Sequence, residues 1–251
     1  MKKNLLALAF LVGLLTCCKS EDAPIKPVKP TDPGSINKEY MSRAETTFAN
    51  IFKYYWSDKV RMMFGSYPNT LGTPQEPSSP DYDSHAYLWG LGSVVSAFNA
   101  IVQNTDNVDF RMTYESRLKE TLLKYYNTTK EPMCFGCFVN PHDQRLYDDA
   151  IWVGIDLADL YSKTKDSWYL DYAKSVWNFV LSGKDDELGG GVYWDENAKD
   201  SKNTCSNAPA VVLALKLYQI TNDAAYLENG KDIYKWTKSK LQDPSDYLYW
   251  D

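Results

Sequence analysis

Residues 146–155 of this chain read Leu-Tyr-Asp-Asp-Ala-Ile-Trp-Val-Gly-Ile, and they are the most informative part of the sequence. Two adjacent carboxylates, Asp148 and Asp149, stand at the start of an apolar run. One interpretation is structural, because aspartate is a good N-cap and negative charge suits a helix N-terminus. The other is chemical, because two neighbouring carboxyl groups in a cleft can act as nucleophile and as acid and base. Taken alone, the pair indicates a cap more often than a catalytic site, so the choice between the two interpretations depends on the rest of the sequence.

The apolar run belongs to one of seven helices that the hydrophobic pattern predicts. They are expected at about 37–56, 86–104, 108–126, 148–163, 167–182, 206–221 and 223–241. The second, fourth and sixth are apolar and rich in small residues, which is typical of helices that are buried on most sides. The other four are amphipathic, as surface helices are. Residues 189–194, which include three glycines, could form a short hairpin of strands.

An internal repeat pairs these helices. Leu160-Tyr161 recurs as Leu217-Tyr218, and Tyr169-Leu170 recurs as Tyr226-Leu227, in both cases 57 residues later (218 minus 161, 226 minus 169). The repeating unit is a buried helix, a short turn and a surface helix. Such hairpins stacked in a ring would form an inner and an outer barrel of helices, and a straight solenoid is the alternative.

Long loops precede the apolar helices, whereas short turns follow them. The loops cover residues 79–85, 140–149 and 189–207. If the inner helices run parallel, their N-termini lie at one end of the barrel and the three loops converge on one rim. Functional residues are often found on such loops. Asp148 and Asp149 lie on this rim.

Four blocks of sequence resemble glycoside hydrolase family 76, the endo-α-1,6-mannanases. The blocks are Tyr147-Asp148-Asp149-x-x-Trp152, Gly190-Gly191-Val192-Tyr193-Trp194-Asp195, Lys202-Asn203-Thr204-Cys205-Ser206-Asn207 and Asp243-Pro244-Ser245-Asp246-Tyr247-Leu248-Tyr249-Trp250-Asp251. The resemblance runs from about residue 37 to the last residue and implies an all-α fold, an (α/α)6 toroid of helical hairpins. It also implies retaining, endo-acting hydrolysis of α-1,6-mannosidic bonds in mannan, without a cofactor. Asp148 would be the nucleophile and Asp149 the acid/base.

The chemistry of the residues agrees with this role. A retaining mechanism needs two carboxyl groups about 5–5.5 Å apart. Neighbouring residues at a helix start differ by about 100° in direction and can present oxygen atoms at such a spacing. The acid must also hold a proton near neutral pH. The helix dipole opposes this and the adjacent negative charge favours it, so the sequence leaves the balance at Asp149 open.

Five residues near the rim are candidates for binding substrate, in a chain whose aromatic content is 14%. Tyr193 and Trp194 could stack on mannose, since flat aromatic faces suit sugar rings, or could be a buried pair after a tight turn. Asn203 and Asn207 could bind sugar hydroxyls or cap the sixth helix. Trp152 lies near the rim inside an apolar helix, where the core is the favoured place.

The remaining polar and sulfur side chains predict no metal site. His85 and His142 have no partner at metal-ligand spacing and are expected to be solvated loop residues. The lone pair Cys134 and Cys137 could be a loop disulfide or two free thiols. We expect Cys205 to be a small buried residue and Trp89 to lie in the core. Asp156 and Asp159, one helical turn apart, could line the barrel or form a satisfied network.

The N-terminus has the features of a bacterial lipoprotein. A charged start and an apolar run too short to span a bilayer lead to Leu14-Leu15-Thr16-Cys17-Cys18, which resembles a lipobox. We expect residues 1–18 to be the signal, with Cys18 lipidated and Cys17 as the alternative. Residues 19–35 are a proline-rich tether, and 36–251 are the glycosidase domain. The expected location is the outer membrane surface. The net charge of −6 argues against a nucleic-acid partner.

A full toroid of this kind has twelve helices, and about seven are expected here, so the domain is expected to be an incomplete, N-terminal part. For the chain as given we expect a monomer that is poorly soluble or inactive, because inner helices would show apolar faces to water. A soluble monomer that hydrolyses α-1,6-mannan would contradict this. The alternatives are a non-catalytic glycan-binding surface lipoprotein and another (α/α)6 carbohydrate-active enzyme. Lyases and glucuronyl hydrolases of that fold act on acidic sugars and need a basic cleft.

Overall fold

The computed structural model describes residues 38–68, 85–139 and 144–251. Within these ranges there are seven α-helices, as predicted, and every helix end lies within two residues of its expected place. The helices are α2 (Lys38–Tyr55), α3 (Leu88–Asn104), α4 (Val108–Tyr125), α5 (Tyr147–Thr164), α6 (Ser167–Ser182), α7 (Thr204–Thr221) and α8 (Ala224–Leu241). The predicted signal, Cys17, Cys18, the tether and His142 lie outside the described residues, as does most of the loop before α3.

Short strand pairs join some of the helices. β1 (Trp56–Ser57) pairs with β2 (Met62–Met63), and β3 (Tyr126–Asn127) pairs with β4 (Cys134–Phe135), both antiparallel. The predicted hairpin over 189–194 is wrong. No strand lies within residues 189–194; the 3-10 helix η2 (Glu187–Gly189) and glycines with positive φ occupy the first part of this segment. Val192 instead forms a bridge with Lys184, and Asp195 forms one with Leu146.

The two helical hairpins, α5–α6 and α7–α8, have the same conformation even in their turns. Lys165 and Asn222, which are 57 residues apart (222 minus 165), both adopt the left-handed conformation after α5 and α7. Each donates its N–H to a helix carbonyl at 2.8 Å. The next residues, Asp166 and Asp223, cap α6 and α8 through their carboxylates. The sequence repeat is therefore a repeat of structure, as predicted.

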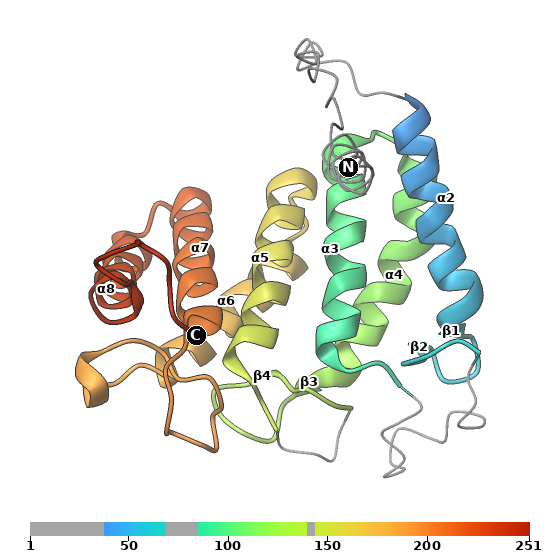
Figure 1. The fold of residues 1–251 in the computed structure, drawn as a ribbon. Coiled ribbons are helices and arrows are strands. Elements are labelled where there is room, and N and C mark those ends of the chain that lie inside the picture. Colours follow the sequence, from blue (N-terminus) through green and yellow to red (C-terminus); the bar gives the residue numbers. More distant parts are fainter. Residues whose placement is uncertain (1–37, 69–84, 140–143) are drawn as a thin grey trace, which may run out of the picture. The chain divides into compact units, whose positions relative to one another are not determined.

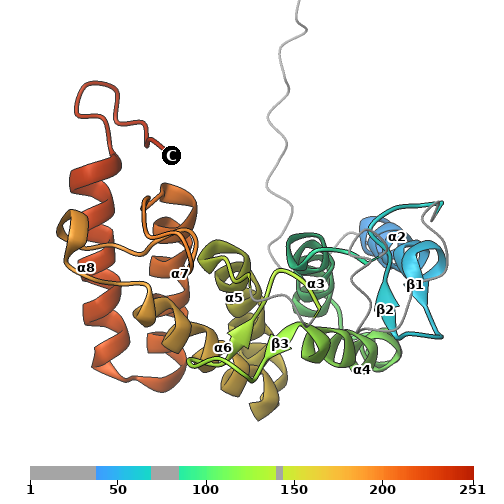
Figure 2. The same cartoon turned by 90° about the horizontal axis from the view of Figure 1, so that it is seen from below.

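Three inner helices, α3, α5 and α7, lie side by side, with α5 between the other two (Figure 1). The helices α4 and α6 lie on one side of this row, as the view in Figure 2 shows. The predicted burial of α5 on most sides is confirmed, because eleven of its side chains or glycines are buried. Gly154 allows this close packing, since a Cβ there would lie 2.9 Å from Val176 and 3.1 Å from Leu213.

The N-termini of the inner helices meet at one end. Leu88, at the start of α3, donates its N–H to the carbonyl of Cys137 at 2.9 Å, and Tyr147, at the start of α5, donates to Trp194 at 2.9 Å. Near the start of α7, the side chain of Asn207 bonds the main chain of Val192. The described parts of the long loops therefore share one rim, where the sequence places Asp148 and Asp149.

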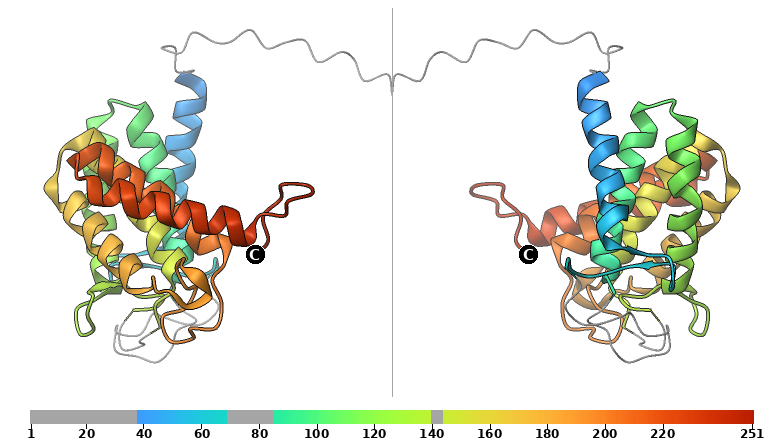
Figure 3. Two further views of the ribbon diagram at one scale, coloured as in Figure 1. Left: turned by 90° about the vertical axis from the view of Figure 1, so that its left-hand side faces the viewer. Right: turned by 90° about the vertical axis from the view of Figure 1, so that its right-hand side faces the viewer.

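The segment after α8 returns to the same rim. Figure 3 shows it leaving the end of α8 and turning back. The N–H of Cys205, in the first turn of α7, donates to Asp251 Oδ1 at 3.0 Å. None of the helices in the described ranges is both long and apolar enough to cross a bilayer.

Candidate active site

Asp148 and Asp149 occupy the first turn of α5, but neither takes the N-cap position, which belongs to Leu146. Asp148 is half-buried, and its Oδ2 accepts a hydrogen bond from Trp194 Nε1 at 3.3 Å. Its Oδ1 is buried and has no hydrogen-bond partner among the described residues. Asp149 is only 9% exposed. Helix capping therefore does not explain why two acidic residues stand here.

The two carboxyl groups have different electrostatic surroundings. Burial raises the pKa of Asp149 to about 6, and the charge of Asp148 adds to this, while a hydrogen bond from the Cys137 thiol opposes it. Burial also raises the pKa of Asp148, but hydrogen bonds from the Asp149 main chain and the Trp194 indole counteract it. Desolvation and the neighbouring charge thus outweigh the hydrogen bond from Cys137, so the pKa of the Asp149 carboxyl lies above its usual range. Asp149 is suited to carry a proton, and Asp148 is suited to be the anion.

Replacing Asp149 with asparagine is expected to stabilise the fold more at pH 7 than at pH 4. A carboxyl whose pKa is raised by folding binds more protons when folded than when unfolded, between its unfolded pKa and about 6. Its cost to stability therefore grows as pH rises through that window. Melting temperatures of the parent and of Asp149→Asn at both pH values measure this. The exposed Asp200→Asn serves as the control, and an equal gain at both pH values would contradict the assigned environment.

A hollow of about 190 Å³ opens beside Asp149 between α3 and α5. Its lining residues are Trp89, Gly92, Ser93, Ser96, Asp149 and Trp152. Trp89 is 56% exposed and Trp152 is 43% exposed, so the expectation that they lie in the core is wrong for both. The apolar pattern of the inner helices suggested burial on every side, but these two rings lie on faces that no other described helix covers.

In the part of the chain that the structure describes, Trp194 and Asn203 are two predicted sugar contacts whose side chains have no structural role that accounts for them. Trp194 is 38% exposed beside Asp148. Asn203 is the N-cap residue of α7, yet its side chain makes no capping bond. Its Oδ1 is buried and has no partner among the residues described. Both therefore remain candidates for substrate binding.

For Tyr193 and Asn207, the structure indicates a structural role instead of the predicted contact with sugar. Tyr193 is 1% exposed, so no face of its ring is free to stack. Asn207 is fully buried; its Oδ1 accepts from Val192 N at 2.7 Å, and its Nδ2 donates to the carbonyls of Val192 and Asn203, both at 2.8 Å. Neither amide proton is left for a sugar hydroxyl. Burial of Tyr193 after a tight turn and a structural role for Asn207 were the alternatives to sugar contact, and the structure favours them.

Arg145 is a residue that sequence reasoning missed. Its fully buried guanidinium donates to both carboxylate oxygens of Glu196, at 2.8 and 2.5 Å. It also donates to the carbonyls of Lys130 at 3.1 Å and Pro132 at 2.7 Å. The Arg145 side chain thus connects its own loop, which leads into the aspartate pair, with the loop that contains Lys130 and Pro132 and with the loop that contains Glu196. The only signal in the sequence is a charged residue three positions before Asp148.

The polar groups of the inner helices form a satisfied network, one of the two options for Asp156 and Asp159. Asp156 accepts hydrogen bonds from Ser96 and from Asn99, the latter at 2.8 Å. Asp159 pairs with Lys216 at 2.5 Å. Since Ser96 also lines the hollow beside Asp149, the network reaches the wall of this hollow.

The three cysteines in the described ranges are free thiols, which decides between the two options for Cys134 and Cys137. Burial raises the pKa of each of these thiols to about 12. Cys205 is half-buried, less than expected. No cluster of metal-ligating side chains occurs among the described residues. His85 forms a main-chain bridge with Phe64.

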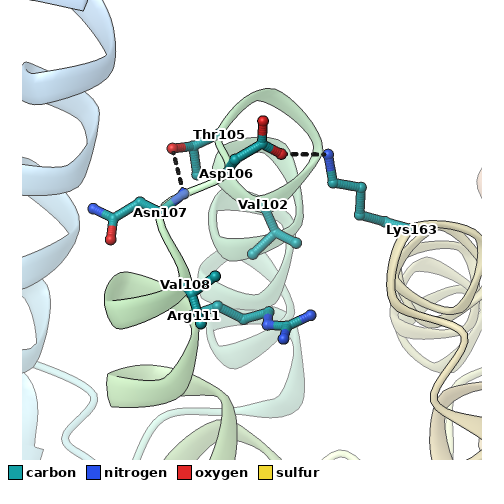
Figure 4. A pocket seen from close by; sticks show the side chains of 7 residues that line it. All are labelled: Val102, Thr105, Asp106, Asn107, Val108, Arg111 and Lys163. Carbon is teal, nitrogen blue, oxygen red and sulfur yellow. Dashed lines mark hydrogen bonds and ion pairs between the residues drawn. The ribbon is translucent and has the colours of Figure 1, made fainter.

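A second hollow, of about 140 Å³, lies at the opposite end of the inner helices (Figure 4). There Asp106 pairs with Lys163 at 3.6 Å, and Asn107 donates its N–H to Thr105 at 3.1 Å. Its one carboxylate, Asp106, is already paired with a lysine. The hollow lined by Asp149 adjoins the aspartate pair at the start of α5, and we take it as the candidate active site.

The sequence profile of glycosyl hydrolase family 76 matches residues 39–251. The chain belongs to glycoside hydrolase family 76. Solved members of family 76 have the same fold, so the predicted all-α toroid of helical hairpins is confirmed over the part that this chain contains.

Three solved structures illustrate the likeness. A family 76 glycoside hydrolase from a bovine Bacteroides thetaiotaomicron strain is 31% identical, with a TM-score of 0.73, over 83% of this chain and 44% of its own. A family 76 mannosidase of Bacteroides thetaiotaomicron is 27% identical, with a TM-score of 0.74, over 84% and 56%. An α-1,6-mannanase of Salegentibacter, inactivated by replacing two consecutive aspartates and bound to α-1,6-mannotetrose, is 25% identical, with a TM-score of 0.63, over 84% and 55%. The chain thus spans about half the length of these relatives.

Proposed function

We propose that the full-length protein is a retaining glycoside hydrolase that cleaves α-1,6-mannosidic bonds within mannan. The observation that carries the proposal is the pair Asp148 and Asp149, two adjacent carboxyl groups in different electrostatic surroundings, of which Asp149 lines a hollow together with two tryptophans. Membership of family 76 supports the linkage, because its Salegentibacter member binds an α-1,6-linked mannan fragment and is inactive without two consecutive aspartates.

In the proposed mechanism, Asp148 attacks the anomeric carbon while Asp149 gives its proton to the leaving oxygen. The glycosidic bond breaks and an ester to Asp148 forms. Asp149, now ionised, takes a proton from water, whose oxygen attacks the anomeric carbon and releases Asp148. The indole N–H of Trp194 holds the Asp148 carboxylate in place for the attack. No metal or cofactor has a part in these steps.

The hollow next to Asp149 supplies the features that a sugar ring needs. Trp89 and Trp152 offer apolar ring faces, and Ser93 offers a hydroxyl, which donates to the Trp89 carbonyl at 3.3 Å. Substrate binding therefore extends from Asp149 along α3, a helix that sequence reasoning assigned to the core.

The proposal is tested by incubating the full-length protein with α-1,6-mannotetraose and with α-1,2- and α-1,3-linked mannobiose. We expect shorter α-1,6-linked products and no cleavage of the other two. Binding without cleavage would instead favour the glycan-binding alternative. Products with ultraviolet absorption from a new double bond would favour a lyase. Either result would overturn the proposal.

Replacing Trp89 with alanine is expected to raise KM for α-1,6-mannotetraose roughly threefold to tenfold and to change kcat little. A lost stacking partner removes about 1 kcal/mol of binding that ground state and transition state share. Steady-state kinetics measure the two constants. Tyr234→Ala is a matched control, because Tyr234 is 50% exposed on α8, outside the hollow. A lower kcat at unchanged KM would contradict this role.

We further propose that Cys18 carries a lipid that anchors the protein in the outer membrane, with residues 19–35 as the tether. The support is the lipobox-like sequence Leu14-Leu15-Thr16-Cys17-Cys18. Labelling cells with a palmitate analogue should mark the parent but not Cys18→Ser. Label that is lost only with Cys17→Ser would move the site to Cys17, and accessibility to protease on intact cells tests surface exposure.

A further inference from the structure

Lys202 is, like Arg145, a buried charged residue near the rim. Its side chain is fully buried, and its Nζ meets four oxygen atoms. These are Asp185 Oδ1 at 2.7 Å, Asp185 O at 3.2 Å, Glu187 O at 2.8 Å and Gly190 O at 2.9 Å. The ammonium also lies 4.3 Å from the ring centroid of Tyr193. A buried charge is tolerated only with such partners, so the turn 185–190 and Lys202 depend on each other.

The glycines of this turn have the geometry that the lysine needs. Gly190 and Gly191 have φ of +118° and +77°, which other residues rarely adopt. A Cβ at Gly191 would also lie 2.4 Å from a ring atom of Trp236. The turn therefore contacts both Trp236 of α8 and the ammonium of Lys202.

The same turn leads directly to Trp194. Four residues after Gly190, the Trp194 N–H donates to Ser201 O at 3.2 Å, next to Lys202. The Trp194 carbonyl accepts from Tyr147 N at 2.9 Å, and its indole Nε1 donates to Asp148 Oδ2 at 3.3 Å. Two buried side chains near the start of α7 thus bind the segment that leads to Trp194. Lys202 binds the turn 185–190, and Asn207 binds the main chain of Val192.

We propose that Lys202 is a positioning residue: its ammonium gathers the carbonyl groups of the 185–190 turn and so fixes Trp194 against Asp148. The kinetic part of the proposal rests on the proposed function, whereas the geometric part does not.

The test uses Lys202→Ala in the full-length protein, with and without added ethylammonium. The first readout is the indole ¹H–¹⁵N resonance of Trp194, assigned by its absence in Trp194→Phe. We expect this resonance to shift in Lys202→Ala, and kcat to fall about 10- to 100-fold with KM nearly unchanged, because a small misplacement of a reacting group has such an effect. Ethylammonium fits the vacated oxygen cage and should restore both readouts in part.

Lys184→Ala is the matched control. Lys184 lies near the same turn, but it pairs with Asp232 at 3.5 Å and with Asn229 at 3.4 Å, on α8. It should leave the Trp194 resonance and kcat unchanged and show no response to ethylammonium. Asp185→Asn is the second variant, used if Lys202→Ala loses its helical circular dichroism, because it keeps every main-chain acceptor and removes one charge. It should give the same changes at smaller size.

The proposal is overturned if the Trp194 resonance and kcat stay at parent values in a folded Lys202→Ala or Asp185→Asn. A lower melting temperature alone, with both readouts unchanged, would show that Lys202 only stabilises the fold. If the parent protein does not cleave α-1,6-mannan, the proposed function fails. The resonance of Trp194 and its recovery with ethylammonium still decide the positioning role in that case.

Discussion

Replacing Asp148 with asparagine is expected to lower kcat on α-1,6-mannotetraose by a factor on the order of 10⁴–10⁶, because the amide cannot form the ester intermediate. Binding of α-1,6-mannotriose, measured by calorimetry, should change much less, since the tryptophan-lined hollow is untouched. Loss of the carboxylate also removes the acceptor of the Trp194 indole, but the amide oxygen can replace it.

Asp200→Asn is the control for this prediction, because Asp200 is an exposed residue of the loop before α7. Its kcat should match that of the parent. Retained turnover in Asp148→Asn would end the assignment of the nucleophile. Asp149→Asn should instead retain activity on a substrate whose leaving group departs without protonation, because cleavage of such a substrate does not need the acid.

Replacing Arg145 with methionine is expected to destabilise the fold by about 3–5 kcal/mol, the range for breaking a buried ion pair by removing one partner. Methionine has a similar stem but removes the bidentate partner of Glu196 and the hydrogen bonds that Arg145 donates to the carbonyls of Lys130 and Pro132. Urea denaturation followed by circular dichroism measures the free energy of unfolding. Kinetic losses should accompany it, because Arg145 joins the loops on which Asp148 and Asp149 rest.

Arg43→Met is the matched control for Arg145. Its pair with Glu39 lies on the surface of α2, where both side chains are well over half exposed. Such surface pairs contribute less than about 1 kcal/mol. An equal loss in the two variants would show that burial of the Arg145 pair is not what matters.

The helices could be predicted because their signals are local. The apolar run after Asp149 needs burial on most sides, and the repeat of 57 residues places Asp166 and Asp223 at equivalent helix starts. Capping and periodicity depend on neighbours within a few residues, so a single sequence contains them. The convergence of the loops on one rim followed from the parallel inner helices.

Side-chain direction and long-range partners could not be predicted. Tyr193 and Trp194 are neighbours, yet one is buried and the other is exposed beside Asp148. Lys202 and Arg145 find their partners up to 17 and 51 residues away. The pKa of Asp149 depends on how deeply the folded chain buries it, which no local pattern contains. These features all arise from tertiary packing around the rim.

The most direct test of the central claim is the stereochemistry of cleavage. Proton NMR of α-1,6-mannotetraose, recorded from the first minutes of hydrolysis by the full-length protein, resolves the two anomers of each new reducing end. Two displacements at the anomeric carbon, with Asp148 as nucleophile and Asp149 as acid and then base, predict that the α-anomer appears first. Initial release of the β-anomer would mean a single displacement by water and would contradict the roles assigned to this pair.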